Sequence, residues 1–256
     1  VLNADPAHKR PQPLLYRLPE VLTFFRRISA PVLFVEGDQT LYFMFFNGKY
    51  SRDEFIERSK DKPFLLYVAF DNPHIPLAAP AQGLAANAQS FHPTYAALVE
   101  SLDAAVGRIL KALEDQGVAQ NTFVVFASDN GGVHVSELKE TPPTHNEPCR
   151  AGKGFVYEGG LRTPLIIRFP GRLAVREIAE PVVLGDLCPT ICALAKVPAP
   201  ATLDFQDISP VLFEGKATAA AKPRALFWHQ PHYMNQGGKP GGVVREGDWK
   251  LVEQYE

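Results

Sequence analysis

A long amphipathic segment followed by an apolar run constrains the fold of this chain more than any other feature. Apolar residues recur at steps of three and four, which marks one face of a helix: Tyr95, Leu98, Leu102, Val106, Ile109 and Leu113. Gly117 is expected to end this helix. The run from Phe123 to Ala127 is continuously apolar and rich in β-branched and aromatic residues, which predicts a central strand covered on both faces.

Strands and helices alternate along the rest of the chain. We expect strands near residues 31–35, 64–70, 123–127 and 164–169, and helices near residues 51–59, 95–113 and 186–196. This order favours an α/β fold with a mostly parallel sheet flanked by helices on both faces. Residues 243–252 are typical of a hairpin, which predicts a partial antiparallel subdomain at the C-terminal end.

The predicted strand at 123–127 leads into a possible metal site. Asp129 and Asn130 follow it within Ser-Asp-Asn-Gly-Gly, so they lie at the carboxyl end of a strand, where α/β sheets bind ligands. A carboxylate beside an amide oxygen suits Ca²⁺ or Mg²⁺. The same four residues, Asp-Asn-Gly-Gly, are also good turn formers, and the pattern alone leaves both interpretations open.

Two basic side chains are further candidates. Lys153 lies between two glycines, where a lysine is either a solvated loop residue or a charge placed beside a ligand. His74 follows the apolar strand at 64–70 and comes shortly before Pro76. It can be a proton donor, or a turn residue held by a backbone hydrogen bond.

Five stretches of the sequence together resemble one family. They run in the same order as in that family, within about Asn47 to Glu256: residues 63–77, 95–132, 150–164, 184–190 and 228–233. These stretches resemble the sulfatase family of the alkaline phosphatase superfamily. The resemblance implies an alkaline phosphatase/sulfatase-like fold and hydrolysis of sulfate esters by a formylglycine hydrate, with a divalent cation, most often Ca²⁺.

The resemblance also implies roles for individual residues. Asp129 and Asn130 match metal ligands, and the ion would act as a Lewis acid. Lys153 matches the catalytic lysine that contacts the sulfate. His74 matches the catalytic histidine that binds the sulfate or the bridging oxygen, and His232 matches a position that contacts the substrate. The implied substrate is a small-molecule or carbohydrate sulfate ester.

Three parts of the family pattern do not occur in this sequence. It has no strand ending in two adjacent aspartates, no Cys-x-Pro-x-Arg or serine counterpart as formylglycine precursor, and no Lys-x-His after it. The first hypothesis is therefore a metal-dependent sulfatase-type hydrolase that is incomplete as written. The alternative is a non-catalytic sulfatase remnant that binds a cation or an anionic ligand without turnover. A phosphodiesterase or phosphonate hydrolase of the same superfamily would also need a nucleophile.

The N-terminal residues have a different resemblance. Residues 1–40 resemble a fragment of an α/β-hydrolase, although they lack its Gly-x-Ser-x-Gly elbow, and Asp38 is interpreted as a turn residue. We predict a fusion or gene-model artefact at 1–45, a sulfatase-like portion at 46–200 and a partial C-terminal subdomain at 201–256. Alternatively, the strand near 31–35 takes the place of the missing first strand, and Glu36 and Asp38 lend ligands to the metal.

Composition excludes several classes of partner. The chain has 26 Lys and Arg against 28 Asp and Glu, and no basic stripe, so a nucleic acid is not expected. No apolar run reaches the ~20 residues of a membrane span, and the first residues do not form a signal peptide. Three cysteines are too few for a disulfide framework. The compartment stays open, although sulfatases of this type are commonly exported.

Overall fold

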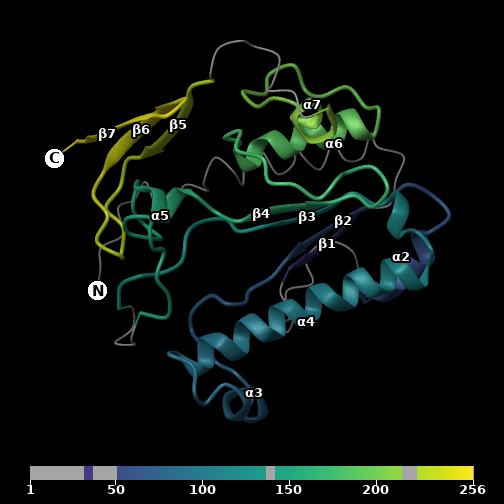
Figure 1. Ribbon diagram of the computed structural model, residues 1–256, viewed down its shortest axis with the longest axis horizontal. Coiled ribbons are helices and arrows are strands. Elements are labelled where there is room, and N and C mark those ends of the chain that lie inside the picture. The colour runs from purple at the N-terminus through teal and green to yellow at the C-terminus, as the bar shows by residue number, and fades with distance from the viewer. Residues whose placement is uncertain (1–31, 37–50, 137–141, 215–223, 256) are drawn as a thin grey trace, which may run out of the picture. The chain divides into compact units, whose positions relative to one another are not determined.

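The computed structural model describes residues 32–36, 51–136, 142–214 and 224–255 (Figure 1). These residues belong to two compact units, one with residues up to 80 and 97–118, the other with residues 81–96 and from 119 onward. The predicted domain boundaries at residues 45 and 200 stay predictions. Asp38, and all of the predicted α/β-hydrolase-like fragment except the main chain of residues 32–36, lie outside the described residues.

The first unit contains a parallel strand pair and a capped helix. Strand β1 (Val32–Glu36) pairs in parallel with β2 (Leu65–Ala69), with Val32 opposite Leu65. Helix α2 (Arg52–Ser59) begins with a capping box. In this box the Ser51 amide donates to Glu54 Oε2 at 2.6 Å, and the Glu54 amide donates to Ser51 Oγ at 3.3 Å. The predicted strands and helix of this region are therefore confirmed.

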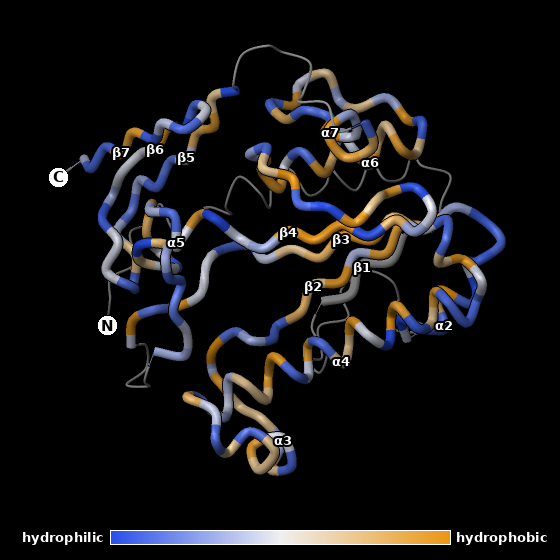
Figure 2. Tube along the Cα trace, viewed as in Figure 1, coloured by the Kyte–Doolittle hydropathy of each residue, from blue (hydrophilic) through white to orange (hydrophobic). Residues whose placement is uncertain are grey.

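Helix α4 (Pro93–Asp115) confirms the amphipathic pattern. Apolar and polar stretches alternate along it in Figure 2, and Leu98, Ala105 and Leu113 are buried. Gly117 ends the helix with a φ of 72°, in the left-handed region that glycine tolerates. The Val118 amide donates to the Leu113 carbonyl and the Gly117 amide to that of Glu114, as in a Schellman motif.

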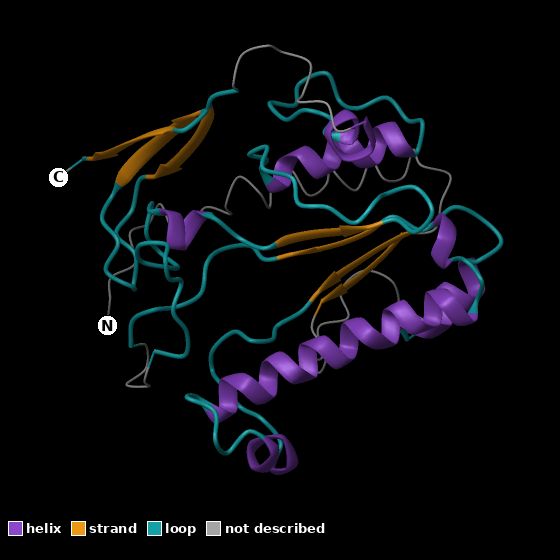
Figure 3. Cartoon of the chain, viewed as in Figure 1, coloured by secondary structure: helices purple, strands orange, loops and turns teal. Residues whose placement is uncertain are grey.

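The second unit carries the remaining elements. Figure 3 shows the helices of the chain in purple and its strands in orange. In chain order they are α3 (Ala81–Ala86), η2 (Ala119–Asn121), β3 (Val124–Ala127), α5 (Glu158–Leu161), β4 (Leu165–Arg168), η3 (Leu184–Asp186), α6 (Leu187–Leu194), α7 (Ser209–Glu214), β5 (Leu226–Gln230), β6 (Gly241–Glu246) and β7 (Trp249–Gln254). Strands β5, β6 and β7 form an antiparallel sheet. The predicted hairpin is confirmed, because Gly247 and Asp248 form the two-residue connection between β6 and β7.

The expectation of a mostly parallel sheet is wrong for the strands described. Strand β3 pairs antiparallel with β4, with Ala127 opposite Leu165. A parallel pair needs a crossover to the other end of the sheet, usually through a long helix. Here the chain leaves β3, makes loops and the one-turn helix α5, and re-enters β4 at the same end. The strand β3 is half-buried rather than fully covered, and Ala127 is exposed.

A buried ion pair fixes the region around α6. Asp186 is fully buried, and Arg224 donates to its two carboxylate oxygens at 2.8 and 2.5 Å. The amides of Val183 and Gln206 donate to the same carboxylate. The Thr190 hydroxyl donates to the Asp186 carbonyl and accepts from the Ile208 amide. We call these groups the Asp186 network.

Helix α6 also carries two of the three free cysteines. Burial raises the pKa of the Cys192 thiol to about 12 and also raises the pKa of Cys188. Both side chains are therefore thiols at neutral pH. Within the described ranges, no helix has the length and apolar character needed to span a membrane.

Candidate functional site

The chain between β3 and β4 carries most of the candidate residues. Because the two strands are antiparallel, residues 128–164 leave and return at one end of the ladder. The Ser128 amide donates to the Pro164 carbonyl at 3.3 Å and the Gly131 amide to the Gly160 carbonyl at 3.0 Å. These bonds hold the segment that carries Asp129 and Asn130 against the segment that precedes β4.

Glycines allow these segments to touch main chain to main chain. A Cβ built on Gly131 would lie 1.7 Å from the Gly159 carbonyl oxygen. One built on Gly159 would lie 2.0 Å from the Ala151 oxygen, and one on Gly152 would lie 2.2 Å from the Gly132 oxygen. No side chain fits at such positions. We call the residues that make this contact the glycine cluster: Gly131, Gly132, Gly152, Gly159 and Gly160.

The cluster joins the loop of the candidate metal ligands to the loop of Lys153. The Lys153 amide donates to the Gly132 carbonyl at 3.1 Å. Asp129 is exposed, and both Asn130 and Lys153 are half-buried. The bond from Lys153 to Gly132 joins two main-chain groups, so it does not use the carboxylate of Asp129. The structure thus brings three of the predicted residues into one region.

The two candidate metal ligands fit only part of a calcium site. Asp129 and Asn130 offer hard oxygen donors, whereas Ca²⁺ takes six to eight of them. Across the part of the chain that the structure describes, no group of three or more His, Cys, Asp or Glu side chains could hold a metal ion. The donor chemistry agrees with calcium, and further ligands have to come from other groups.

The loop of His232 contacts the residue after Lys153. Gln230, at the end of β5, donates from Nε2 to the Gly154 carbonyl at 3.2 Å. A Cβ on Gly238 would lie 1.7 Å from the same carbonyl oxygen. Residues 231–240 therefore pack against the Lys153 loop, and His232 within them is exposed. Sequence reasoning gave no indication of this contact.

His74 belongs to the first unit, whereas the other candidates belong to the second. It is exposed, its Nδ1 lies 2.7 Å from the Ile75 carbonyl oxygen, and its amide donates to the Asp71 carbonyl. These are the bonds expected of a turn residue, the alternative that the sequence left open.

Asn146 is a residue of the site that the sequence analysis missed. Its Oδ1 accepts from the Gly132 amide at 3.0 Å, and its Nδ2 donates to the carbonyls of Gly132 at 2.9 Å and Ala151 at 3.0 Å. One side chain thus joins both loops. No periodicity or motif marks it, since it lies in a polar, proline-bearing loop.

A polar, proline-bearing loop at 134–145 follows the glycine pair at 131–132, and residues 137–141 within it lie outside the described residues. Both described ends pack against aromatic rings. The His134 ring lies edge-on to Phe155 with centroids 5.1 Å apart, and the His145 ring lies 5.8 Å from that of Phe91.

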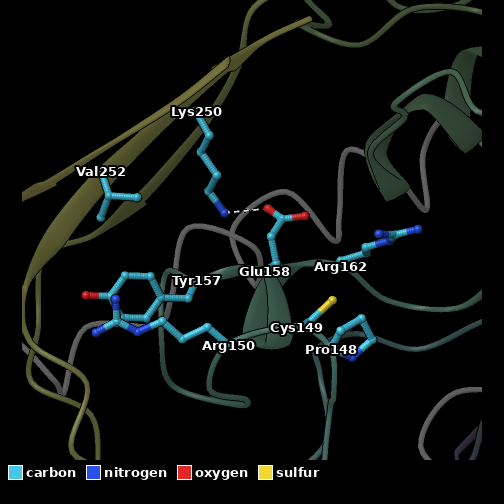
Figure 4. Close-up of a pocket in the computed structure, with 8 residues that line it drawn as sticks. All are labelled: Pro148, Cys149, Arg150, Tyr157, Glu158, Arg162, Lys250 and Val252. Atoms are coloured by element: carbon cyan, nitrogen blue, oxygen red, sulfur yellow. Dashed lines mark hydrogen bonds and ion pairs between the residues drawn. The ribbon is translucent and has the colours of Figure 1, made fainter. Parts of the chain in front are cut away.

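A pocket of about 400 Å³ lies beside α5 (Figure 4). Lys250 donates to Glu158 at 2.6 Å across it, and the Arg150 guanidinium stacks 3.9 Å above the Tyr157 ring. The third free cysteine, Cys149, lines the same pocket. The pocket therefore combines three cationic side chains, Arg150, Arg162 and Lys250, with one carboxylate.

Solved structures with this fold are known. The crystal structure of Ps i-CgsB in complex with k-i-k-neocarrahexaose matches with a TM-score of 0.68 and 29% identity, over 80% of this chain and 44% of that chain. A structure described as a complex with its substrate D-glucosamine-2-N,6-O-disulfate matches with a TM-score of 0.62 over 91% of this chain and 72% of that chain. At 16% identity, the second likeness shows the fold alone.

Sequence comparison identifies the family. The pattern of the Sulfatase family matches residues 50–197, and that of the N-sulphoglucosamine sulphohydrolase C-terminal region matches residues 150–256. A sulfatase of Formosa agariphila is 38% identical over 228 residues, which cover 78% of this chain and 40% of the relative. The chain belongs to the sulfatase family. It spans less than half the length of that relative.

Proposed function

We propose that the chain takes part in sulfatase-type hydrolysis of a sulfate ester, with a divalent cation held by Asp129 and Asn130 and the sulfate contacted by Lys153. The observation that carries this proposal is the hydrogen bond from the Lys153 amide to the Gly132 carbonyl. This bond joins the loop of Asp129 and Asn130 to the loop of Lys153. A sulfate ester needs positive charge on both sides of its oxygens, and this arrangement can supply it.

The two oxygen donors fit a hard cation such as Ca²⁺. A cation bound there would supply Lewis-acid polarisation of a sulfate oxygen. Lys153 contributes a fixed positive charge that stabilises the negative charge developing on the sulfate oxygens as the ester S–O bond breaks. His232, in the loop beside Lys153, can bind the alcohol part of the ester, and the role of His74 as proton donor stays a prediction from the sequence.

No formylglycine precursor occurs in this sequence, so no step is assigned to such a group. The thiols of α6, of which Cys188 is half-buried and Cys192 buried, do not replace it, because burial raises the pKa of both. This observation favours a second candidate function for the chain by itself: a sulfatase portion that binds a cation and an anionic ligand without turnover.

The substrate class that the fold favours is a sulfated carbohydrate. The matched structure of Ps i-CgsB, 29% identical, holds a neocarrahexaose, an oligosaccharide. An exposed His232 beside the Lys153 loop suits recognition of sugar hydroxyl groups. We extend this class to the chain as a proposal.

Turnover of 4-nitrophenyl sulfate in the presence of calcium separates the two candidates. Hydrolysis by the chain, abolished by Lys153→Ala, would support the hydrolase. Binding of inorganic sulfate without hydrolysis, weakened by Lys153→Ala, would support the non-catalytic candidate. Lys111→Ala, on the exposed face of α4, is the matched control and should change neither quantity. If the wild-type chain neither hydrolyses the ester nor binds sulfate, the proposed role of Lys153 is wrong.

A further inference from the structure

We propose that Asn146 is the positioning residue of the candidate site and sets the Lys153 loop against the loop of Asp129 and Asn130. The functional part of this inference rests on the proposed function, whereas its structural part stands on the hydrogen bonds alone. Nothing in the sequence pattern assigns Asn146 a role.

The amide of Asn146 is fully used by the two loops. Its Oδ1 accepts from the Gly132 amide, and its Nδ2 donates to the Gly132 carbonyl, so the side chain pairs with one residue as a neighbouring strand would. The second Nδ2 hydrogen goes to the Ala151 carbonyl. Gly132 comes two residues after Asn130, and Ala151 two residues before Lys153. Asn146 therefore bridges the two candidate ligand loops.

The surrounding residues leave room for this side chain. A Cβ on Gly152 would lie 2.6 Å from Asn146 Nδ2, and one on Gly132 would lie 3.2 Å from Asn146 Oδ1. The Gly132 carbonyl accepts from both Asn146 and the Lys153 amide, at 2.9 and 3.1 Å. Moving Asn146 thus loosens the carbonyl that also holds the Lys153 main chain.

Among side chains of the length of Asn146, only asparagine can make all three hydrogen bonds. Aspartate has no hydrogen to donate, and alanine has neither donor nor acceptor. Asn146→Asp keeps the acceptor for the Gly132 amide but places a carboxylate against two carbonyl oxygens. Asn146→Ala removes every bond. The two variants therefore separate the acceptor from the donor role.

Amide hydrogen exchange tests the structural part directly. We expect Asn146→Ala to speed exchange at the Gly132 and Lys153 amides by about tenfold, the effect of losing one net hydrogen bond. Asn146→Asp should leave the Gly132 amide protected and speed only that of Lys153. Asn87→Ala is the matched control, because Asn87 bonds the nearby Gly83 and Ser90. Unchanged exchange in both Asn146 variants would overturn the proposal.

Binding of inorganic sulfate, measured by calorimetry, tests the functional part. At temperatures where the variant stays folded, Asn146→Ala should weaken sulfate binding about tenfold, whereas Asn87→Ala should not. A variant with loosened amides and wild-type sulfate affinity would reduce Asn146 to a structural residue and overturn its positioning role. If the wild-type chain binds no sulfate, the proposed function fails, and the exchange rates alone decide on Asn146. If Asn146→Ala does not fold, Asn146→Asp carries both measurements.

Discussion

The glycine cluster and the Asp186 network are both polar regions of the second unit, but different groups hold them together. In the cluster, main-chain amides and carbonyls meet where any Cβ would clash, and Asp129 remains exposed. In the network, the carboxylate of Asp186 is itself buried and bound by Arg224 and two amides. A region built from main chain leaves side chains available for a ligand, whereas a region built from buried side chains stabilises the fold.

The comparison predicts the largest effect for a methyl group added inside the cluster. Gly131→Ala would place a Cβ 1.7 Å from the Gly159 oxygen, which belongs to the main chain and cannot rotate away. We expect a loss of about 4 kcal/mol or more in the free energy of unfolding, measured by denaturant titration.

Gly107→Ala is the matched control for that substitution. A Cβ on Gly107 meets nothing within 4 Å, and the residue lies inside α4. Here we expect stabilisation by about 0.5–1 kcal/mol, because alanine loses less conformational freedom in a helix. Equal unfolding free energies for the two variants would contradict the close main-chain contact at Gly131.

The next effect is expected in the Asp186 network. Asp186→Ala would leave Arg224 without its carboxylate, at a cost of about 3 kcal/mol. This is the low end for breaking a buried pair, because the Arg224 side chain keeps 21% of its surface exposed. Thermal unfolding measures the loss.

Asp115→Ala is the control for Asp186. Its partner Lys111 forms an exposed pair one helical turn away, with both side chains more than half exposed, and we expect no measurable change. If Asp186→Ala is equally neutral, the network does not stabilise the second unit. If Asp186→Ala leaves the protein folded but alters its calcium affinity, the Asp186 network also contributes to ligand binding, which would contradict its purely stabilising role.

The smallest effect concerns the exposed capping box of α2, a polar pair that is neither buried nor main-chain only. Hydrogen bonds from the Ser51 amide and hydroxyl lower the pKa of the Glu54 carboxyl below its ordinary 4.5. The ionised Glu54 carboxylate therefore stabilises the folded state at pH values above the pKa that Glu54 has in the unfolded chain. This stabilisation is lost as the pH falls through the lower pKa of Glu54 in the folded chain. Unfolding midpoints between about pH 5 and about pH 3 should fall more steeply for the wild type than for Glu54→Gln. Parallel curves would exclude this contribution.

Local patterns predicted most elements of the structure. The periodicity of α4, Gly117 at its end and the apolar run of β3 all appear where expected. Direction was predicted wrongly for β3 and β4, since alternation of elements does not reveal that the chain returns to the same end of a ladder. Strand direction depends on contacts far apart in the sequence, which periodicity does not encode.

The sequence predicted the candidate ligands of the site but not the residues that hold their loops in place. Asp129, Asn130 and Lys153 were found through motifs, and the structure joins their loops. Asn146 was missed because it bonds Gly132, 14 residues away in the sequence. The close approach of Gly238 to Gly154 was missed because these residues are 84 positions apart. His74 was also found through a motif, but its bonds to the carbonyls of Ile75 and Asp71 are those of a turn residue, and its catalytic role stays a prediction.

Calcium titration of the purified chain by calorimetry tests the central claim most directly. The variants are Asp129→Ala, Asn130→Ala and, as a control away from the site, Asp115→Ala on α4. The account predicts binding by the wild type and by the control, and loss of binding in the two site variants, because their oxygen donors are removed. Equal heats in all four proteins, or none in the wild type, would contradict a cation site at Asp129 and Asn130.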